Sequence, residues 1–219
     1  MMKKNYPPEV QEQLDKFISR KGFNTIAESE YSGMMDYLST FSVYEHLVPV
    51  LTDNQSNYWC LYAGGILQNK VCHLDHEEAS LQPLFRNVAS LLAVIEDNPD
   101  YFDFYDIPLS SFDYPPLKSD AEDLSLIEQL RKKLETKTDD DIRQQLAFSI
   151  MALTSLEDIE SIYPFLRDDD MYIQERAIHL LGQWKYKPAK ALLIELKDSA
   201  MHNGRLAAQI ALKKLNQNE

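Results

Sequence analysis

The sequence is poor in the residues that would assign it to several common classes of protein. Its 219 residues include 2 Cys and 6 Gly. Two cysteines, Cys60 and Cys72, are too few for the disulfide framework of a small secreted domain, so we expect free thiols in a reducing compartment. The one adjacent pair of glycines, Gly64 and Gly65, does not make a glycine-rich loop that could cradle a nucleotide. We therefore predict that the protein uses no cofactor.

Long apolar runs are also missing. No stretch approaches the roughly 18 apolar residues that a membrane-spanning helix needs. The start of the chain, MMKKNYPPEV, lacks the apolar centre of a signal peptide. These absences predict a cytoplasmic protein that does not bind a membrane.

The chain has no excess of basic residues, and its formal net charge is −13. Direct binding to a phosphate backbone needs a basic face, so we expect no direct contact with nucleic acid. Residues 1–119 carry 8 Lys and Arg against 17 Asp and Glu. Most of this excess lies in one stretch that contains a single basic residue, Arg86. Its acidic residues are Asp75, Glu77, Glu78, Glu96, Asp97, Asp100, Asp103, Asp106 and Asp113. They form either a solvated face that aids solubility or a docking surface for a basic partner.

Reactive side chains are few and are not arranged in a known catalytic or metal-binding pattern. The possible soft-metal ligands are Cys60, Cys72, His73 and His76. Their spacing matches no zinc module, and alternation along a strand sends Cys72 and His73 to opposite faces. Residues 73–77 include acid–base groups, but no nucleophile motif or phosphate loop accompanies them. We predict no metal site, no catalytic residue and no enzymatic activity.

The first half of the chain has the pattern of an antiparallel α+β domain, which we bound at residues 1–97. Pro8 and the residues after it favour a helix with Val10, Leu14, Phe17 and Ile18 on one side. Short runs at 48–51, 58–63 and 71–75 predict three strands, with a polar turn at 53–57. Helices are also expected from Ser32 to Phe41 and from Pro83 onward, the latter with Phe85, Val88, Leu92 and Ile95 facing the sheet.

Residues 98–119 predict a connector, because they contain four prolines and show no period. Their aromatic side chains would be costly to leave in water, so the connector is expected to lie against one or both domains. The candidate partner-binding residues fall here and just before it: Asp75, Glu77, Glu78, Asp100, Tyr101, Phe102, Asp103, Tyr105 and Asp106. In the competing interpretation, the aromatic residues of this set instead hold the connector to its own domains.

Residues 120–219 show helices that recur at a spacing of 31 residues, which predicts an all-α repeat domain. Ile142, Ile173 and Gly204 are related by this step, and so are Leu146, Ala177 and Ala208. A further helix precedes each of these, which gives three helical hairpins. One hairpin cannot bury its apolar stripe alone, so the three must stack, and we expect close helix packing at Ala177 and Ala208.

The first half resembles the SUKH superfamily, specifically its Smi/Knr branch. The resemblance rests on Val48-Pro49-Val50, on NYWCLY at 57–62, and on KVCHLDHEE at 70–78 followed by a helix. It implies an α+β fold. It also implies a function, because bacterial members of the family are commonly immunity proteins that bind and neutralise a cognate toxin, often a nuclease.

The second half resembles HEAT repeats of the short, lyase-associated type. The acidic turns at 139–141 and 168–170, each followed by an aliphatic residue and Arg or Gln, carry this resemblance. Gln174 stands where the family usually has Arg, and Gly204 where it usually has an aliphatic residue. We therefore expect the ladder of side-chain contacts between repeats to be broken. The acidic turns themselves are expected to cap helices rather than to bind metal.

These observations favour a non-enzymatic protein-binding module, and the SUKH resemblance makes it a bacterial immunity protein whose partner is a basic toxin domain. The alternative is a HEAT-repeat scaffold or adaptor that the α+β domain caps. A third hypothesis, an accessory to an enzyme, follows from the lyase-like repeats, but no reactive Cys at a helix N-terminus supports it. The sequence does not indicate the oligomeric state or the face that binds.

Overall fold

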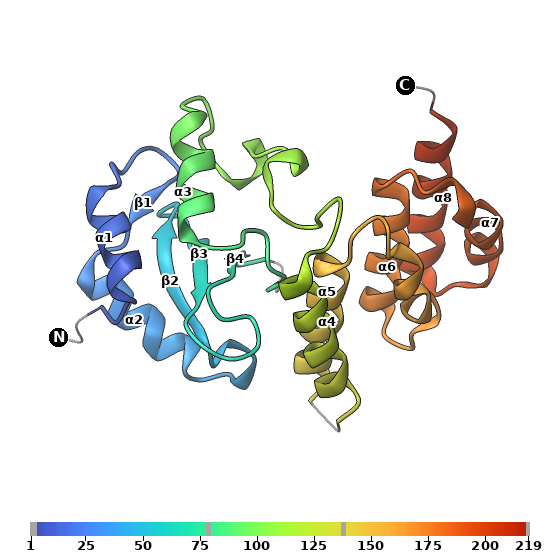
Figure 1. The fold of residues 1–219 in the computed structure, drawn as a ribbon, viewed down its shortest axis with the longest axis horizontal. Helices are drawn as coiled ribbons and strands as arrows, with labels where there is room; N and C mark the ends of the chain where they lie inside the picture. The colour runs from blue at the N-terminus through green and yellow to red at the C-terminus, as the bar shows by residue number, and fades with distance from the viewer. Residues whose placement is uncertain (1–3, 78–79, 137–138, 218–219) are drawn as a thin grey trace. The chain divides into compact units, whose positions relative to one another are not determined.

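The computed structural model describes residues 4–77, 80–136 and 139–217 (Figure 1). The chain divides into two compact units, Met1–Tyr114 and Pro115–Glu219. Within the described ranges, no helix is long and apolar enough to cross a membrane.

A four-stranded antiparallel sheet forms the centre of the first unit (Figure 1). Its strands lie in the order β1 (Asn24–Thr25), β2 (Leu47–Thr52), β3 (Tyr58–Tyr62) and β4 (Val71–Leu74). The three predicted strands and their antiparallel pairing are confirmed. The sequence did not indicate β1, since two residues are too short to show alternation.

Three helices accompany the sheet: α1 (Pro8–Lys16), α2 (Glu28–Leu38) and α3 (Val88–Asp97). The prediction that a helix opens at Pro83 is wrong. The amide of Val71 donates a hydrogen bond to the carbonyl of Phe85, which ties residues 84–85 to β4 in extended form. The helix begins only after Asn87, whose side chain accepts a hydrogen bond from the amide of Ser90.

Two predicted core positions are also wrong. Helix α1 ends at Lys16, and Ile18 beyond it is 83% exposed. Helix α2 begins and ends a few residues earlier than predicted, so Phe41 lies outside it and is 46% exposed. Because the helical period does not extend to these residues, their side chains leave the buried stripe.

The core of this unit lies between one face of the sheet and helices α1 and α3, and it includes Leu14, Trp59, Leu61, Phe85 and Leu91. The segment 98–114 adds Ile107 to this core, and Tyr101, Phe104 and Phe112 pack against it. Two short 3₁₀ helices, η2 (Phe104–Asp106) and η3 (Leu109–Ser111), shape the segment. Most of the stretch that the sequence assigned to a connector therefore belongs to the first unit, which extends to Tyr114.

The second unit is helical, as predicted. Its elements are α4 (Ala121–Leu134), α5 (Asp140–Leu153), η4 (Ile159–Arg167), α6 (Met171–Gln183), η5 (Lys187–Ala189), α7 (Lys190–Ser199) and α8 (His202–Asn216). Where the sequence favoured a helix from Leu156 to Leu166, the chain forms the 3₁₀ helix η4, which contains Pro164. Proline lacks the amide hydrogen that an α-helix needs in its interior.

The acidic turns cap helices, as expected. The carboxylate of Asp139 accepts a hydrogen bond from the amide of Asp141 at the start of α5. Asp170 accepts from the amides of Tyr172 and Ile173 at the start of α6. Asp168 forms an ion pair with Arg143 at 2.7 Å. These contacts satisfy amides that helix ends leave without partners, and they join consecutive helices.

Gln174 links three elements, so the expected break in the side-chain ladder is not found at this residue. Its amide nitrogen donates to the carbonyl of Leu166 at 3.1 Å, and its amide oxygen accepts from the backbone of Met201 at 2.8 Å. A Cβ atom at Gly204 would lie 2.6 Å from that oxygen. The glycine at position 204 therefore leaves room for the side chain of Gln174.

Small residues lie where α6 and α8 pack closely. Ala177 and Ala208 are completely buried. A Cβ atom at Gly182 would lie 2.7 Å from the Cβ of Ala211 and 2.8 Å from its Cα. The backbones approach so closely that even one additional methyl group has no space.

Two glycine-to-alanine substitutions should therefore have opposite effects on stability. Gly182→Ala should destabilise the protein by about 1–3 kcal/mol, because the new methyl group meets the backbone of α8. The matched control is Gly33→Ala in the middle of α2, where a Cβ atom would meet no heavy atom within 4 Å. This change should stabilise by about 0.5–1 kcal/mol through helix propensity. Urea denaturation measures both, and a stabilising Gly182→Ala would contradict the close packing of α6 and α8.

Candidate functional site

The first unit has an acidic surface that few basic side chains oppose. Residues 1–114 carry 7 Lys and Arg against 17 Asp and Glu. The basic side chains that the structure describes here are engaged within the unit. Lys4 and Arg20 donate hydrogen bonds to backbone carbonyls, and Lys16 pairs with Glu12. Lys21 and Arg86 lie over the rings of Phe102 and Tyr114. Lys70 is buried. The acidic side chains on the surface are therefore left with little local compensation.

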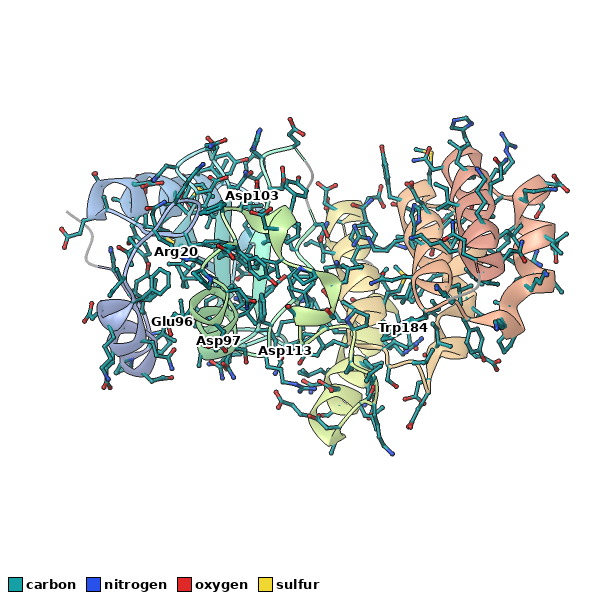
Figure 2. The ribbon with its side chains drawn as sticks, turned by 90° about the horizontal axis from the view of Figure 1, so that it is seen from above. Arg20, Glu96, Asp97, Asp103, Asp113 and Trp184 are labelled. Carbon is teal, nitrogen blue, oxygen red and sulfur yellow. The ribbon has the colours of Figure 1, made fainter. Side chains whose placement is uncertain are left out.

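Arg20 fixes the start of the segment 98–114. Its guanidinium donates hydrogen bonds to the carbonyls of Ile95, Asn98 and Pro99, at the end of α3. The last turn of α3 contains Glu96 and Asp97 and no basic residue. Figure 2 labels these two acids and Arg20. The cation supplies the positive charge that a helix C-terminus favours, which offsets the acidic last turn. The sequence alone did not indicate this role of Arg20, because the contacts span more than seventy residues.

Asp75 and Tyr105 connect the end of β4 to η2. Asp75 accepts hydrogen bonds from the amide of Glu77 at 2.7 Å and from the hydroxyl of Tyr105 at 3.1 Å. Desolvation is the largest single effect and opposes ionisation, but these two hydrogen bonds and the electrostatic influence of His73 and His76 together outweigh it and lower the pKa of Asp75. The same contact raises the pKa of the Tyr105 hydroxyl. The ring of Tyr105 also meets that of Phe104, with centroids 5.3 Å apart, and the residue is 75% exposed.

Asp103 and Asp106 serve the backbone of η2. Asp103 accepts a hydrogen bond from the amide of Tyr105, and Asp106 accepts from the amides of Phe102 and Asp103. This reciprocal arrangement is a capping box. Both carboxylates are exposed and charged, yet replacing them would disturb η2 as well as the surface.

The predicted site residues therefore divide into groups. Tyr101 packs against the core, whereas Phe102 is 49% exposed and Tyr105 is exposed further still. Asp100 and Glu77 are exposed, and Glu78 lies outside the described residues. Asp75, Glu77, Asp103, Tyr105 and Asp106 come close around the contact between Asp75 and Tyr105, and we call these five residues the acidic rim. Asp103 appears in Figure 2 apart from the labelled acids of α3 and from Asp113.

Beneath the rim lies a buried histidine. The ring of His73 stacks on Phe104 with centroids 4.1 Å apart and also meets the edge of Trp59. Its burial lowers the pKa of His73 to about 4, although the carboxylates of Asp75, Asp53 and Asp103 oppose this shift. His73 is therefore neutral at physiological pH and acts as part of the aromatic core.

The remaining Cys and His side chains of this region do not come together in one site. Cys60 and Cys72 are paired across β3 and β4, both are buried, and burial raises the pKa of both thiols. His76 contacts Asn57 through its Nδ1 atom at 2.7 Å. Among the described residues, no three His, Cys, Asp or Glu side chains are grouped so that they could hold a metal ion.

A pocket near the N-terminus is a candidate ligand site. It lies against α1, β1 and β2, has a volume of about 250 Å³, and is lined in part by Tyr6, Leu14, Asp15, Phe17 and Val50. Small-molecule sites usually enclose about 300–1,000 Å³. The hydroxyl of Tyr6 is already engaged with the carbonyl of Pro49. We therefore do not assign a ligand to it.

No family model, curated protein or solved structure matches the chain.

The burial of His73 predicts an acid-sensitive fold. The pKa of His73 is about 4 in the folded state and near 6.5 in the unfolded chain. In the pH window between these two values, the unfolded chain binds a proton that the folded state does not. The free energy of unfolding should therefore decrease as pH falls through this window, by up to about 3 kcal/mol from this residue alone. The variant His73→Phe keeps an aromatic ring against Phe104 and cannot titrate. Urea denaturation of both proteins across the window isolates the effect, and parallel pH profiles would contradict it.

Arg20 is predicted to hold the segment 98–106 in place. Arg20→Met keeps most of the side-chain length but removes the hydrogen bonds to three carbonyls, at a cost of about 1–2 kcal/mol. Limited proteolysis under native conditions should then cut between residues 98 and 106 faster than in the wild type. Lys16→Met, which loses only an exposed ion pair, is the matched control. An unchanged cleavage rate in Arg20→Met would show that the aromatic residues alone anchor the segment.

Proposed function

We propose that this chain is a non-enzymatic protein-binding module, and specifically an immunity protein that binds and neutralises a basic toxin domain. The resemblance of residues 48–78 to the SUKH superfamily motivates the specific form of the proposal. The free, buried thiols of Cys60 and Cys72 suit a protein that works in the cytoplasm.

One observation carries the proposal: the acidic excess of the first unit faces solvent, while each of its described basic side chains already has a partner within the unit. Such a surface attracts a basic partner over distance and accelerates its association. It would also be complementary to the phosphate-binding cleft of a nuclease. The acidic rim adds an exposed aromatic side chain, Tyr105, and aromatic residues ringed by polar groups often carry most of the energy of an interface.

The helical unit supports this function as a short array of HEAT-like hairpins. The contacts of Arg143 and Gln174 link its helices, and in this proposal the unit braces or widens the binding surface. In the alternative function, the hairpins bind the partner as a scaffold and the α+β unit caps them.

The test is co-expression of the full chain with the basic protein that a neighbouring gene encodes. The wild type should restore growth and form a stable complex in gel filtration. The double variant Asp100→Lys and Tyr105→Ala should slow association by about tenfold at low salt and leave the melting temperature nearly unchanged, because both side chains are exposed.

The matched control is the double variant Asp198→Lys and Tyr172→Ala in the helical unit, which makes the same changes at exposed positions. It should behave as the wild type. If the control loses the complex and the variant with Asp100→Lys and Tyr105→Ala keeps it, the scaffold alternative is favoured. If the wild type neither restores growth nor binds, the immunity function is wrong.

A further inference from the structure

Three aromatic side chains, two of them exposed and one partly buried, form a cluster away from the acidic rim. Tyr37 lies on the last turn of α2, Phe41 follows that helix, and Tyr44 lies in η1 (Ser42–Tyr44). The ring centroids are 5.6 Å apart for Tyr37 and Phe41, 5.8 Å for Phe41 and Tyr44, and 6.2 Å for Tyr37 and Tyr44. Tyr37 is 50% exposed and Phe41 is 46% exposed. We call these three residues the aromatic cluster.

The aromatic cluster is not part of the core. The buried residues of α2 are Tyr31 and Leu38, which point to the sheet side. Isolated apolar side chains on a surface are common, but three rings in mutual contact form a continuous apolar patch. Contiguous apolar patches on soluble proteins often mark interaction sites.

The backbone beneath the cluster is held firmly. The carbonyl of His46 accepts a hydrogen bond from the amide of Ala63. The ring of His46 lies against Gly65, where a Cβ atom would be 2.4 Å away from it. The amides of Tyr44 and Glu45 donate to the carbonyls of Phe41 and Ser42. The rings are thus presented on a structured turn, which lowers the entropy that binding costs.

The charged residues nearest to the cluster in the sequence are acidic. No Lys or Arg occurs between Lys21 and Lys70, while this stretch contains five acidic residues. Two of them, Asp36 and Glu45, adjoin Tyr37 and Tyr44 in sequence, and both are exposed. The complementary surface is apolar with Lys or Arg at its margin. A guanidinium or ammonium group is attracted to ring faces and to the flanking carboxylates together.

The aromatic cluster and the acidic rim lie at opposite ends of the sheet. The cluster directly precedes Leu47, which pairs with Tyr62 at one end of β2 and β3. The rim follows Leu74, which pairs with Tyr58 at the other end. The cluster is therefore a second surface and not an extension of the first.

We propose that the aromatic cluster is a docking site for an amphipathic segment of a basic protein, with an apolar side chain seated on the rings and Lys or Arg beside Asp36 and Glu45. This inference rests on the proposed function in that the natural segment would belong to the same basic partner. Its chemistry can be tested without that partner.

The probe is a short fluorescent peptide of leucine and lysine whose helix has one apolar face. Two comparison peptides replace either its leucines by glutamine or its lysines by glutamate. Fluorescence anisotropy with the full-length protein should show binding of the leucine–lysine peptide alone. Phe41→Ala and Tyr37→Ala should each weaken this binding by about tenfold. Tyr172→Ala, at a residue that is 53% exposed in the helical unit, is the matched control and should leave the affinity unchanged.

Thermal melting of each variant shows that it is folded, and Asp36→Lys, which removes no ring, provides an independent test of the charge requirement. The proposal is overturned if the wild type does not prefer the leucine–lysine peptide, or if Phe41→Ala binds it as tightly as the wild type. Self-association of the wild type that Phe41→Ala abolishes would assign the cluster to a second copy of the chain and also overturn the proposal. Growth rescue that depends on Tyr105 and not on Phe41 would reject the cluster while the immunity function stands.

Discussion

The stack of aromatic rings around Phe104 is the interaction on which the first unit depends. Phe104 lies against His73 and Trp59 of the sheet and against Phe112 of its own segment, and Phe85 extends the stack. Apolar burial and ring geometry together make such contacts strong. The stack holds residues 98–114 on the sheet, and it forces His73 to remain neutral. It also determines which side chains of the segment face outward. With Phe104 turned into the core, the neighbouring Tyr105 and the carboxylates of η2 are left in solvent.

The sequence predicted the parts of the fold that follow from local patterns. The strands around Trp59 and Val71, the turn between β2 and β3, and the helical second half all have a period or a turn motif that a single segment displays. The errors arose where a distant contact overrides the local pattern. Pro83 suggested a helix start, but pairing of Phe85 with Val71 keeps that stretch extended. The short strand β1 exists only because β2 lies beside it.

The candidate site was predictable in composition but not in arrangement. The sequence showed that acidic and aromatic residues gather between 75 and 106. It did not show which aromatic rings face the core and which face solvent. Phe104 turns inward while its neighbour Tyr105 turns outward because both lie in η2, a 3₁₀ helix, whose side chains follow a period that differs from those of strands and α-helices. Tyr101, which precedes η2, also packs against the core. The engagement of Arg20 and Lys21 within the fold also depends on tertiary contacts. Without those contacts, the local shortage of free positive charge could not be deduced.

The separation of the acidic rim from the aromatic cluster bears on how one partner would use both. Strands of four to six residues, at about 3.3 Å per residue, span roughly 13–20 Å. A standard interface of about 800 Å² per partner is roughly 30 Å across if it is circular. One partner of ordinary size can therefore reach both ends of this sheet. The rim has many charges and few exposed rings, which favours fast association, whereas the cluster has contiguous rings and few charges, which favours slow dissociation. A partner that contacts both surfaces would be drawn in by the first and retained by the second, so that neither surface would need to supply the whole affinity.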